Sequence, residues 1–85
     1  MKNSQVAKFW HASVAASSRN GNYHTDGLDL FSYNRKIGFT NGSGQKVVIN
    51  YTNAPGGEFV SSTTSHHVNL ARFYADILED VEIKQ

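Results

Sequence analysis

The sequence predicts an α+β domain with two layers, made of an N-terminal helix, a small antiparallel sheet of four to five short strands, and a C-terminal helix. Two observations predict this fold class. Apolar residues recur at helical spacing near both ends of the chain, over about residues 4–17 and 66–80. Between them, the pairs Asp26-Gly27 and Asn41-Gly42 interrupt segments rich in aromatic and β-branched residues, as hairpin turns do.

Composition limits the possible classes of protein. The chain has 85 residues, of which 39% are hydrophobic and none is cysteine. We expect one domain spanning residues 1–85, stabilised by apolar packing, because disulfides and thiolate metal sites are excluded. A core of this size supplies roughly 3–5 kcal/mol of net stability, so homo-oligomerisation would help.

The charges are few and unevenly placed. Up to Arg72 there are seven basic and three acidic residues, and after it one basic and four acidic residues. The net charge of only +1 gives little general attraction for nucleic acid. No apolar run reaches the roughly 18 residues that a membrane span needs, so we expect a soluble protein without membrane contact. The absence of cysteine fits a location in a reducing cytoplasm.

The first helix is expected over about residues 4–17, with Asn3 or Ser4 as its N-cap and with Asn20-Gly21 after its end. Its apolar stripe consists of Val6, Phe9, Trp10 and Val14. Strands are expected at residues 22–25, 28–33, 36–40, 45–51 and 58–62. Residues 33–35 are short enough to be a turn or a bulge, so the second and third of these strands could be one bent strand.

The last helix is expected over about residues 66–80, because its apolar residues form one stripe: Leu70, Phe73, Tyr74, Ile77, Leu78 and Val81. The predicted core joins this stripe to the first helix, through Phe9, Trp10, Leu70, Phe73 and Ile77. On this interpretation, Phe73→Ala should cost about 3–5 kcal/mol.

The junction SSTTSHH at residues 61–67, where the β-type pattern gives way to the last helix, concentrates hydroxyl groups and two histidines. Ser65 or Thr64 is expected to cap the helix. The same helix start, with His66 and His67, could instead receive an anion or an acidic group of a partner. The residues alone leave both interpretations open.

The histidines, the hydroxyl residues and the basic residues raise three other kinds of site. The four histidines and Asp26 lack the spacing that fixes two metal ligands on one face, so no metal or cofactor is expected. A hydrolase lacks its G-x-S-x-G elbow. A sheet face could bind single-stranded nucleic acid if it interleaved cations with aromatic rings, and the candidates are Arg35, Lys36, Lys46, Tyr33, Phe39 and Tyr51.

Two short motifs carry a resemblance to a known group of proteins. They are S-Y-x-x-x-I, with Ser32, Tyr33 and Ile37, and T-T-S-x-H at residues 63–67, before the terminal helix. Over roughly residues 20–72 the chain resembles short, mostly uncharacterised proteins of tailed bacteriophages. The resemblance implies a phage-encoded protein acting in a bacterial cytoplasm, and it supplies no activity. His67 takes the histidine position of the motif, and His66 its open position.

The function expected from these observations is that of a small non-enzymatic interaction protein, which binds a host or phage protein and modulates its activity. The expected binding residues are Thr64, Ser65, His66, His67, Arg35, Lys36 and Lys46. Two alternatives remain: a nucleic-acid-binding protein that uses the basic, aromatic sheet face, and a small metal-dependent or hydrolytic enzyme centred on the histidines.

Overall fold

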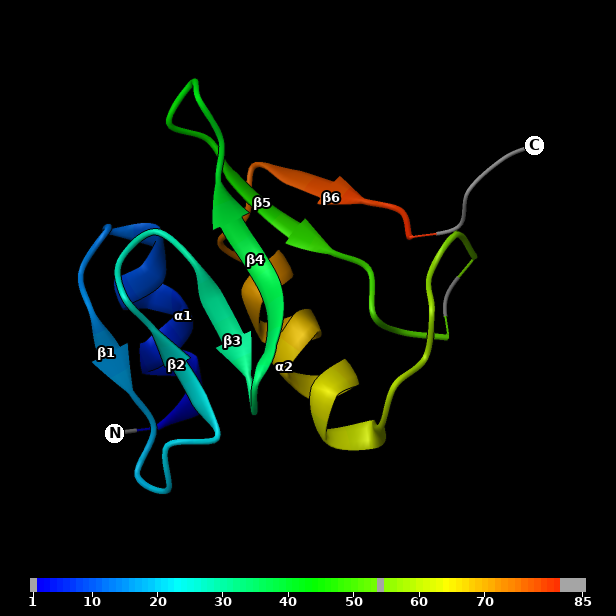
Figure 1. The fold of residues 1–85 in the computed structure, drawn as a ribbon, viewed down its shortest axis with the longest axis horizontal. Coiled ribbons are helices and arrows are strands. Elements are labelled where there is room, and N and C mark those ends of the chain that lie inside the picture. The colour runs from blue at the N-terminus through cyan, green and yellow to red at the C-terminus, as the bar shows by residue number, and fades with distance from the viewer. Residues whose placement is uncertain (1, 54, 82–85) are drawn as a thin grey trace.

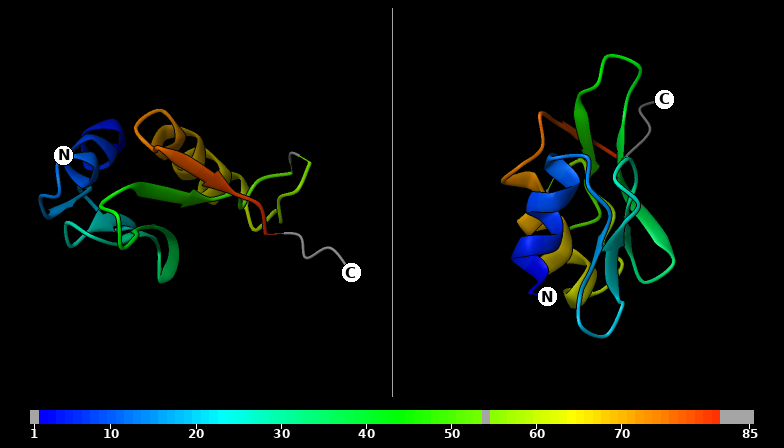
Figure 2. Two further views of the ribbon diagram at one scale, coloured as in Figure 1. Left: turned by 90° about the horizontal axis from the view of Figure 1, so that it is seen from above. Right: turned by 90° about the vertical axis from the view of Figure 1, so that its left-hand side faces the viewer.

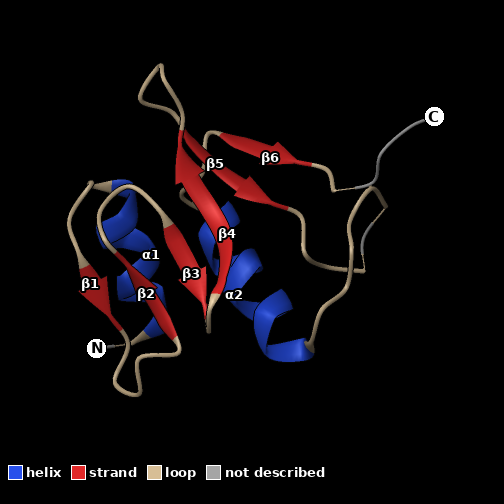
Figure 3. Cartoon of the chain, viewed as in Figure 1, coloured by secondary structure: helices blue, strands red, loops and turns tan. Residues whose placement is uncertain are grey.

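The structure of the chain is a computed structural model that describes residues 2–53 and 55–81. Helices and strands follow one another in the order drawn in Figures 1 and 3. They are α1 (Asn3–His11), β1 (Ala16–Ser17), β2 (Tyr23–Thr25), β3 (Leu30–Ser32), β4 (Arg35–Thr40), β5 (Lys46–Ile49), α2 (Ser62–Arg72) and β6 (Ile77–Glu79).

The strands of the described residues form one six-stranded sheet in sequence order, β1 to β6. Neighbouring strands are antiparallel except β5 and β6, which are parallel because α2 crosses over between them. Both helices lie on the same face of the sheet (Figure 2). The predicted α+β class is therefore confirmed, with a sheet that has slightly more strands than expected and is mixed rather than wholly antiparallel.

The core lies between the two helices and the covered face of the sheet. The Trp10 ring on α1 packs against β4 at Gly38, where an added Cβ would lie 3.0 Å from Trp10 Cζ2. Glycine therefore lets the indole approach the sheet. The indole Nε1 donates a hydrogen bond to the Leu28 carbonyl at 3.0 Å. The fully buried apolar residues are Val6, Ala7, Trp10, Tyr23, Leu30, Ile37, Val48, Val68 and Ala71.

Helix α1 ends at His11, six residues before the predicted end. Ser13 adopts a left-handed conformation with φ of 62°, and the Ser13 and Val14 N–H groups bond to the Trp10 and Phe9 carbonyls. This Schellman arrangement usually uses glycine, so the residue types did not indicate it. Val14 is consequently exposed, and its predicted place in the buried stripe is wrong. The N-cap is Lys2 rather than Asn3 or Ser4.

Helix α2 starts four residues earlier than predicted and ends at Arg72. The prediction of a helix over residues 66–80 is wrong in its last part, because residues 77–79 form β6 beside β5. Phe73 is 84% exposed, so its predicted place in the core is also wrong. Ile77 is likewise partly exposed on β6. An apolar pair at residues 77 and 78 suits a helix stripe and a strand equally well.

Four of the five predicted strands are present within a few residues of their predicted positions, as β2 to β5. Strands β3 and β4 are separate rather than one bent strand, and Tyr33 and Asn34 join them. A register shift beside Leu30 accommodates the extra residue Ile37. The predicted strand at residues 58–62 is wrong: residues 58–61 are irregular and Ser62 begins α2. No helix of the described residues is both long and apolar enough to cross a membrane.

Candidate binding site

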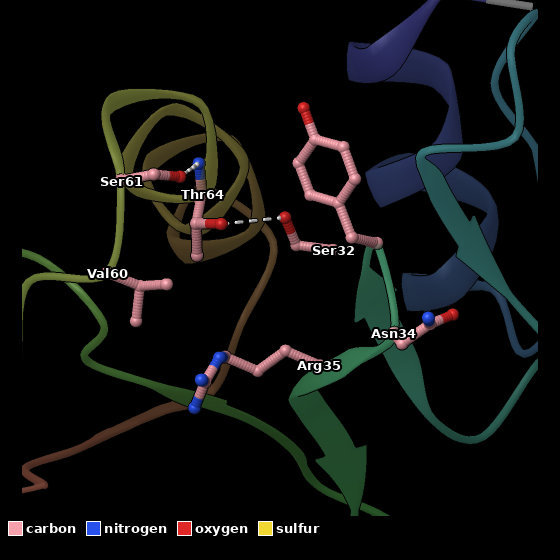
Figure 4. Close-up of a pocket in the computed structure, with 7 residues that line it drawn as sticks. Ser32, Asn34, Arg35, Val60, Ser61 and Thr64 are labelled. Atoms are coloured by element: carbon pink, nitrogen blue, oxygen red, sulfur yellow. Dashed lines mark hydrogen bonds between the residues drawn. The ribbon is translucent and has the colours of Figure 1, made fainter.

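An open pocket of about 530 Å³ lies between the β3–β4 hairpin and the start of α2 (Figure 4). The hairpin and the helix start are far apart in sequence but adjacent in the fold, as Figure 1 shows. The pocket is lined by Ser32, Tyr33, Asn34, Arg35, Val60, Ser61 and Thr64. Two of the predicted binding residues, Arg35 and Thr64, are therefore brought together across it.

The start of α2 forms one wall of the pocket. Ser61 is the N-cap, and its Oγ accepts a hydrogen bond from the Thr64 N–H at 3.1 Å. The prediction that Ser65 or Thr64 caps the helix is wrong, because the helix begins earlier in the run and Ser61 is its N-cap. Ser65 Oγ instead donates to the Tyr51 carbonyl at 3.3 Å, which ties α2 to the end of β5. The signal in the sequence was Ser61 itself, the first residue of the run.

A buried polar network forms the floor of the pocket. Ser32 Oγ lies 2.7 Å from His67 Nδ1 and 3.1 Å from Thr64 Oγ1. The Tyr23 ring stacks on the His67 ring, with centroids 4.3 Å apart and planes 6° from parallel. Tyr23 also donates its hydroxyl proton to the His67 carbonyl at 3.1 Å. Because all of these groups are buried, their hydrogen bonds fix how α2 sits on β2 and β3.

The Ser32–His67 pair has the separation that a nucleophile and its base require. Ser32 is only 1% exposed, however, and its Oγ is also held by Thr64. A buried hydroxyl with two partners is better placed to support the pocket than to attack a substrate. We therefore interpret the network as structural support for the pocket.

The two motifs behind the phage resemblance meet at this floor. Ser32 comes from S-Y-x-x-x-I on the hairpin, and Thr64 and His67 come from T-T-S-x-H on the helix. The positions of the motifs in the sequence, about 30 residues apart, gave no sign of this contact. It arises because the sheet places the β3–β4 hairpin beside the N-terminal half of α2 (Figure 1).

The remaining wall and rim of the pocket combine a cation with apolar side chains. The Arg35 guanidinium lies 5.1 Å from the centroid of the Tyr51 ring. Tyr33 and Val60 are exposed large hydrophobic residues of the lining, and Phe59, next to Val60 in the chain, is 53% exposed. Phe59 is outside the lining and flanks it beside Val60. We call Tyr33 and Val60, together with the flanking Phe59, the pocket rim. The sequence predicts Phe59 and Val60 in a strand rather than at a site.

The other two predicted basic residues lie elsewhere. Lys36 pairs with Phe31 on the uncovered face of the sheet, and its ammonium lies 3.2 Å from Asp29 Oδ2. Lys46 is only 3% exposed, and its Nζ donates three hydrogen bonds inside the protein. The predicted basic sheet face is therefore wrong in its composition: Lys46 is buried, and Arg35 and Lys36 alternate onto opposite faces.

The four histidines do not form a cluster. His66 is exposed, while His67 points into the core with only 2% of its surface accessible. His11 and His24 are bonded to the Tyr74 and Gly21 carbonyls, in separate parts of the fold. In residues 2–53 and 55–81, no group of three histidine or acidic side chains could hold a metal ion.

Burial, and to a lesser degree neighbouring His66, lower the pKa of His67 below its ordinary value of 6.5. Below about pH 6.5 the unfolded chain binds this proton more readily than the folded one, so the free energy of unfolding should decrease as the pH is lowered. One group contributes a slope of at most about 1.4 kcal/mol per pH unit. Urea unfolding of wild type and His67→Gln between pH 7.5 and 5, in steps of about half a unit, measures this contribution.

His66→Gln is the matched control for this experiment. His66→Gln removes only the smaller cause of the lowered His67 pKa. Its free energy of unfolding should therefore still decrease toward acid pH almost as in the wild type, whereas His67→Gln should lose this decrease. Equal slopes for the wild type and His67→Gln would show that the His67 ring is not buried as described.

Comparisons with known proteins place this chain in no group, because no protein family, curated protein or solved structure matches it significantly.

Proposed function

We propose that this chain is a non-enzymatic interaction protein, phage-encoded, which binds a host or phage protein and modulates its activity. The pocket and its rim would be the binding surface. The observation that carries the proposal is the concentration of an arginine, an open pocket and exposed apolar side chains at one place on the surface.

Protein interfaces favour this combination of groups. Arginine and aromatic residues are enriched where binding energy concentrates, and a pocket gives a partner side chain a place to be enclosed. The buried Ser32–His67 network below supports the pocket with fixed side chains, so little ordering would be needed on binding.

Nucleic acid is less well supported as the partner. Phosphate attraction depends on several clustered cations, whereas Lys46 is buried and Lys36 is paired with Asp29. Fluorescence anisotropy with single-stranded DNA at two salt concentrations tests this alternative. We expect no salt-dependent binding, and binding at low salt that Lys36→Gln weakens would favour the alternative.

The proposal predicts which surface residue a partner needs. We expect Phe59→Ser to reduce partner recovery at least about tenfold in affinity purification from an expressing bacterium, because aromatic anchors contribute 2 kcal/mol or more. Phe73→Ser should recover the partner as the wild type does. Phe73 is the matched control because it is an exposed phenylalanine at the other end of α2.

Both substitutions replace exposed side chains, so circular dichroism should show folded proteins for all three chains. The same co-purifying proteins in equal amounts from the wild type, Phe59→Ser and Phe73→Ser would contradict the pocket rim as the binding surface.

A further inference from the structure

Among residues 2–53 and 55–81, Arg35 is the one charged residue in the lining of the pocket, and none of the acidic side chains in these ranges lines it. In the part of the chain that the structure describes, the only ion pair joins Lys36 to Asp29, and no hydrogen bond engages the Arg35 guanidinium. Tyr51 supports the guanidinium through its ring face and leaves the N–H groups available. Arginine carries five such donors in a planar fork that matches a carboxylate.

The rest of the described lining is neutral. Figure 4 shows Arg35 extending from β4 below Val60, with Ser61 and Thr64 above it at the start of α2 and Ser32 beside Thr64. The hydroxyls of these three residues are hydrogen-bonded within the fold, and the Asn34 amide points away from Arg35. Among the described residues, the lining therefore combines one positive charge with neutral groups and contains no acidic side chain.

We propose that the pocket binds one carboxylate from an acidic segment of the partner protein, with Arg35 as its main contact. This inference rests on the proposed function and adds the chemistry of the partner. A single arginine balances the single charge of a carboxylate, whereas a phosphate dianion would keep an uncompensated charge. The apolar rim would add contacts with the apolar neighbours of a carboxylate in a peptide, beyond those that a free carboxylate makes with Arg35.

Two of the predicted binding residues do not contact the carboxylate on this proposal. The side chains of His67 and Ser65 are both hydrogen-bonded within the fold, so neither is available to a partner. The arginine guanidinium is a permanent cation in proteins. Carboxylate binding should therefore not depend on histidine protonation, in contrast to the histidine-based interpretation of the junction.

The probe is sodium acetate, added to the ¹⁵N-labelled full chain at constant ionic strength and followed by NMR. We expect saturable shifts at the Arg35 side-chain N–H and at the backbone N–H groups of residues 62–64. Arg35→Gln should weaken the apparent affinity for acetate about tenfold or more, as expected for a lost charge-assisted hydrogen bond. Lys36→Gln is the matched control, because it removes a neighbouring charge on the opposite sheet face and should leave the titration unchanged.

Three results would overturn the proposal: no saturable shift with acetate, equal affinity in Arg35→Gln, or saturation by inorganic phosphate where acetate has no effect. The affinity purification separates this proposal from the proposed function. A partner that Arg35→Gln retains and Phe59→Ser loses removes the carboxylate contact and leaves the interaction surface. A partner that both variants retain removes the surface itself.

Discussion

Replacing Trp10 with Ala should lower the free energy of unfolding by about 3–5 kcal/mol. The indole is fully buried between α1 and β4, its Nε1 is bonded to the Leu28 carbonyl, and the absence of a side chain at Gly38 makes room for the ring. Trp10 is the largest of the fully buried side chains in the part of the chain that the structure describes. For a domain with only several kcal/mol of total stability, such a loss should leave much of the chain unfolded at 25 °C.

Phe73→Ala is the control for this measurement, and it should change the free energy of unfolding by less than about 0.5 kcal/mol. Phe73 comes directly after the last residue of α2, and its side chain is mostly exposed. The apolar stripe in the sequence predicted the opposite, a loss of stability typical of a core residue. Urea unfolding of the wild type, Trp10→Ala and Phe73→Ala distinguishes the two expectations. A larger loss of unfolding free energy for Phe73→Ala than for Trp10→Ala would mean that α2 continues as the sequence indicated.

The part of the fold that could be predicted is the part governed by local patterns. Hairpin pairs such as Asp26-Gly27 mark turns whatever the rest of the chain does, and the Asp26 carboxylate accepts the N–H groups of Leu28 and Asp29 as such a turn requires. The apolar spacing around Val6 and Trp10 likewise identified the buried face of α1.

The two helix ends could not be predicted, for different reasons. Helix α1 ends because Ser13 takes a left-handed conformation that its residue type does not indicate. After α2, Ile77 and Leu78 join the sheet because the edge of β5 is available to pair with them, and the sequence pattern fits either a helix or a strand there. Tertiary pairing therefore overrode local preference after α2.

The candidate site divides in the same way. The hydroxyl run before α2 was visible as a helix start, and Arg35 and Thr64 were among the candidates. That they face each other across a pocket, and that His67 turns inward to Ser32, follows from the packing of the hairpin against α2. The residue types indicated candidates for the site, but only the fold shows which way each side chain points.

Lys46 shows this most clearly, because the sequence placed it on a surface and the fold places it inside. Its Nζ donates to Ser13 Oγ at 3.0 Å, to the Gly27 carbonyl at 3.1 Å and to Thr40 Oγ1 at 2.7 Å. It also lies 5.7 Å from the centroid of the Trp10 ring. One ammonium thus joins the end of α1, the β2–β3 turn and β4.

We expect Lys46→Ala to lower the free energy of unfolding by about 2–4 kcal/mol, because it leaves the buried Gly27 carbonyl without its donor and removes packing beside Trp10. Burial lowers the pKa of Lys46, so part of this loss is offset by no longer holding a charge away from water. Lys36→Ala, which removes an exposed ion pair, should cost no more than about 1 kcal/mol.

Lys46→Met separates the two contributions, since it restores the aliphatic stem but not the donors. A smaller loss than that of Lys46→Ala, but larger than that of Lys36→Ala, would show that the hydrogen bonds of the ammonium matter beyond its packing. Denaturant midpoints at one pH measure all three variants. If Lys46→Ala unfolds at the same denaturant concentration as the wild type, the ammonium is not enclosed, and Lys46 returns to the exposed basic surface that the sequence predicted.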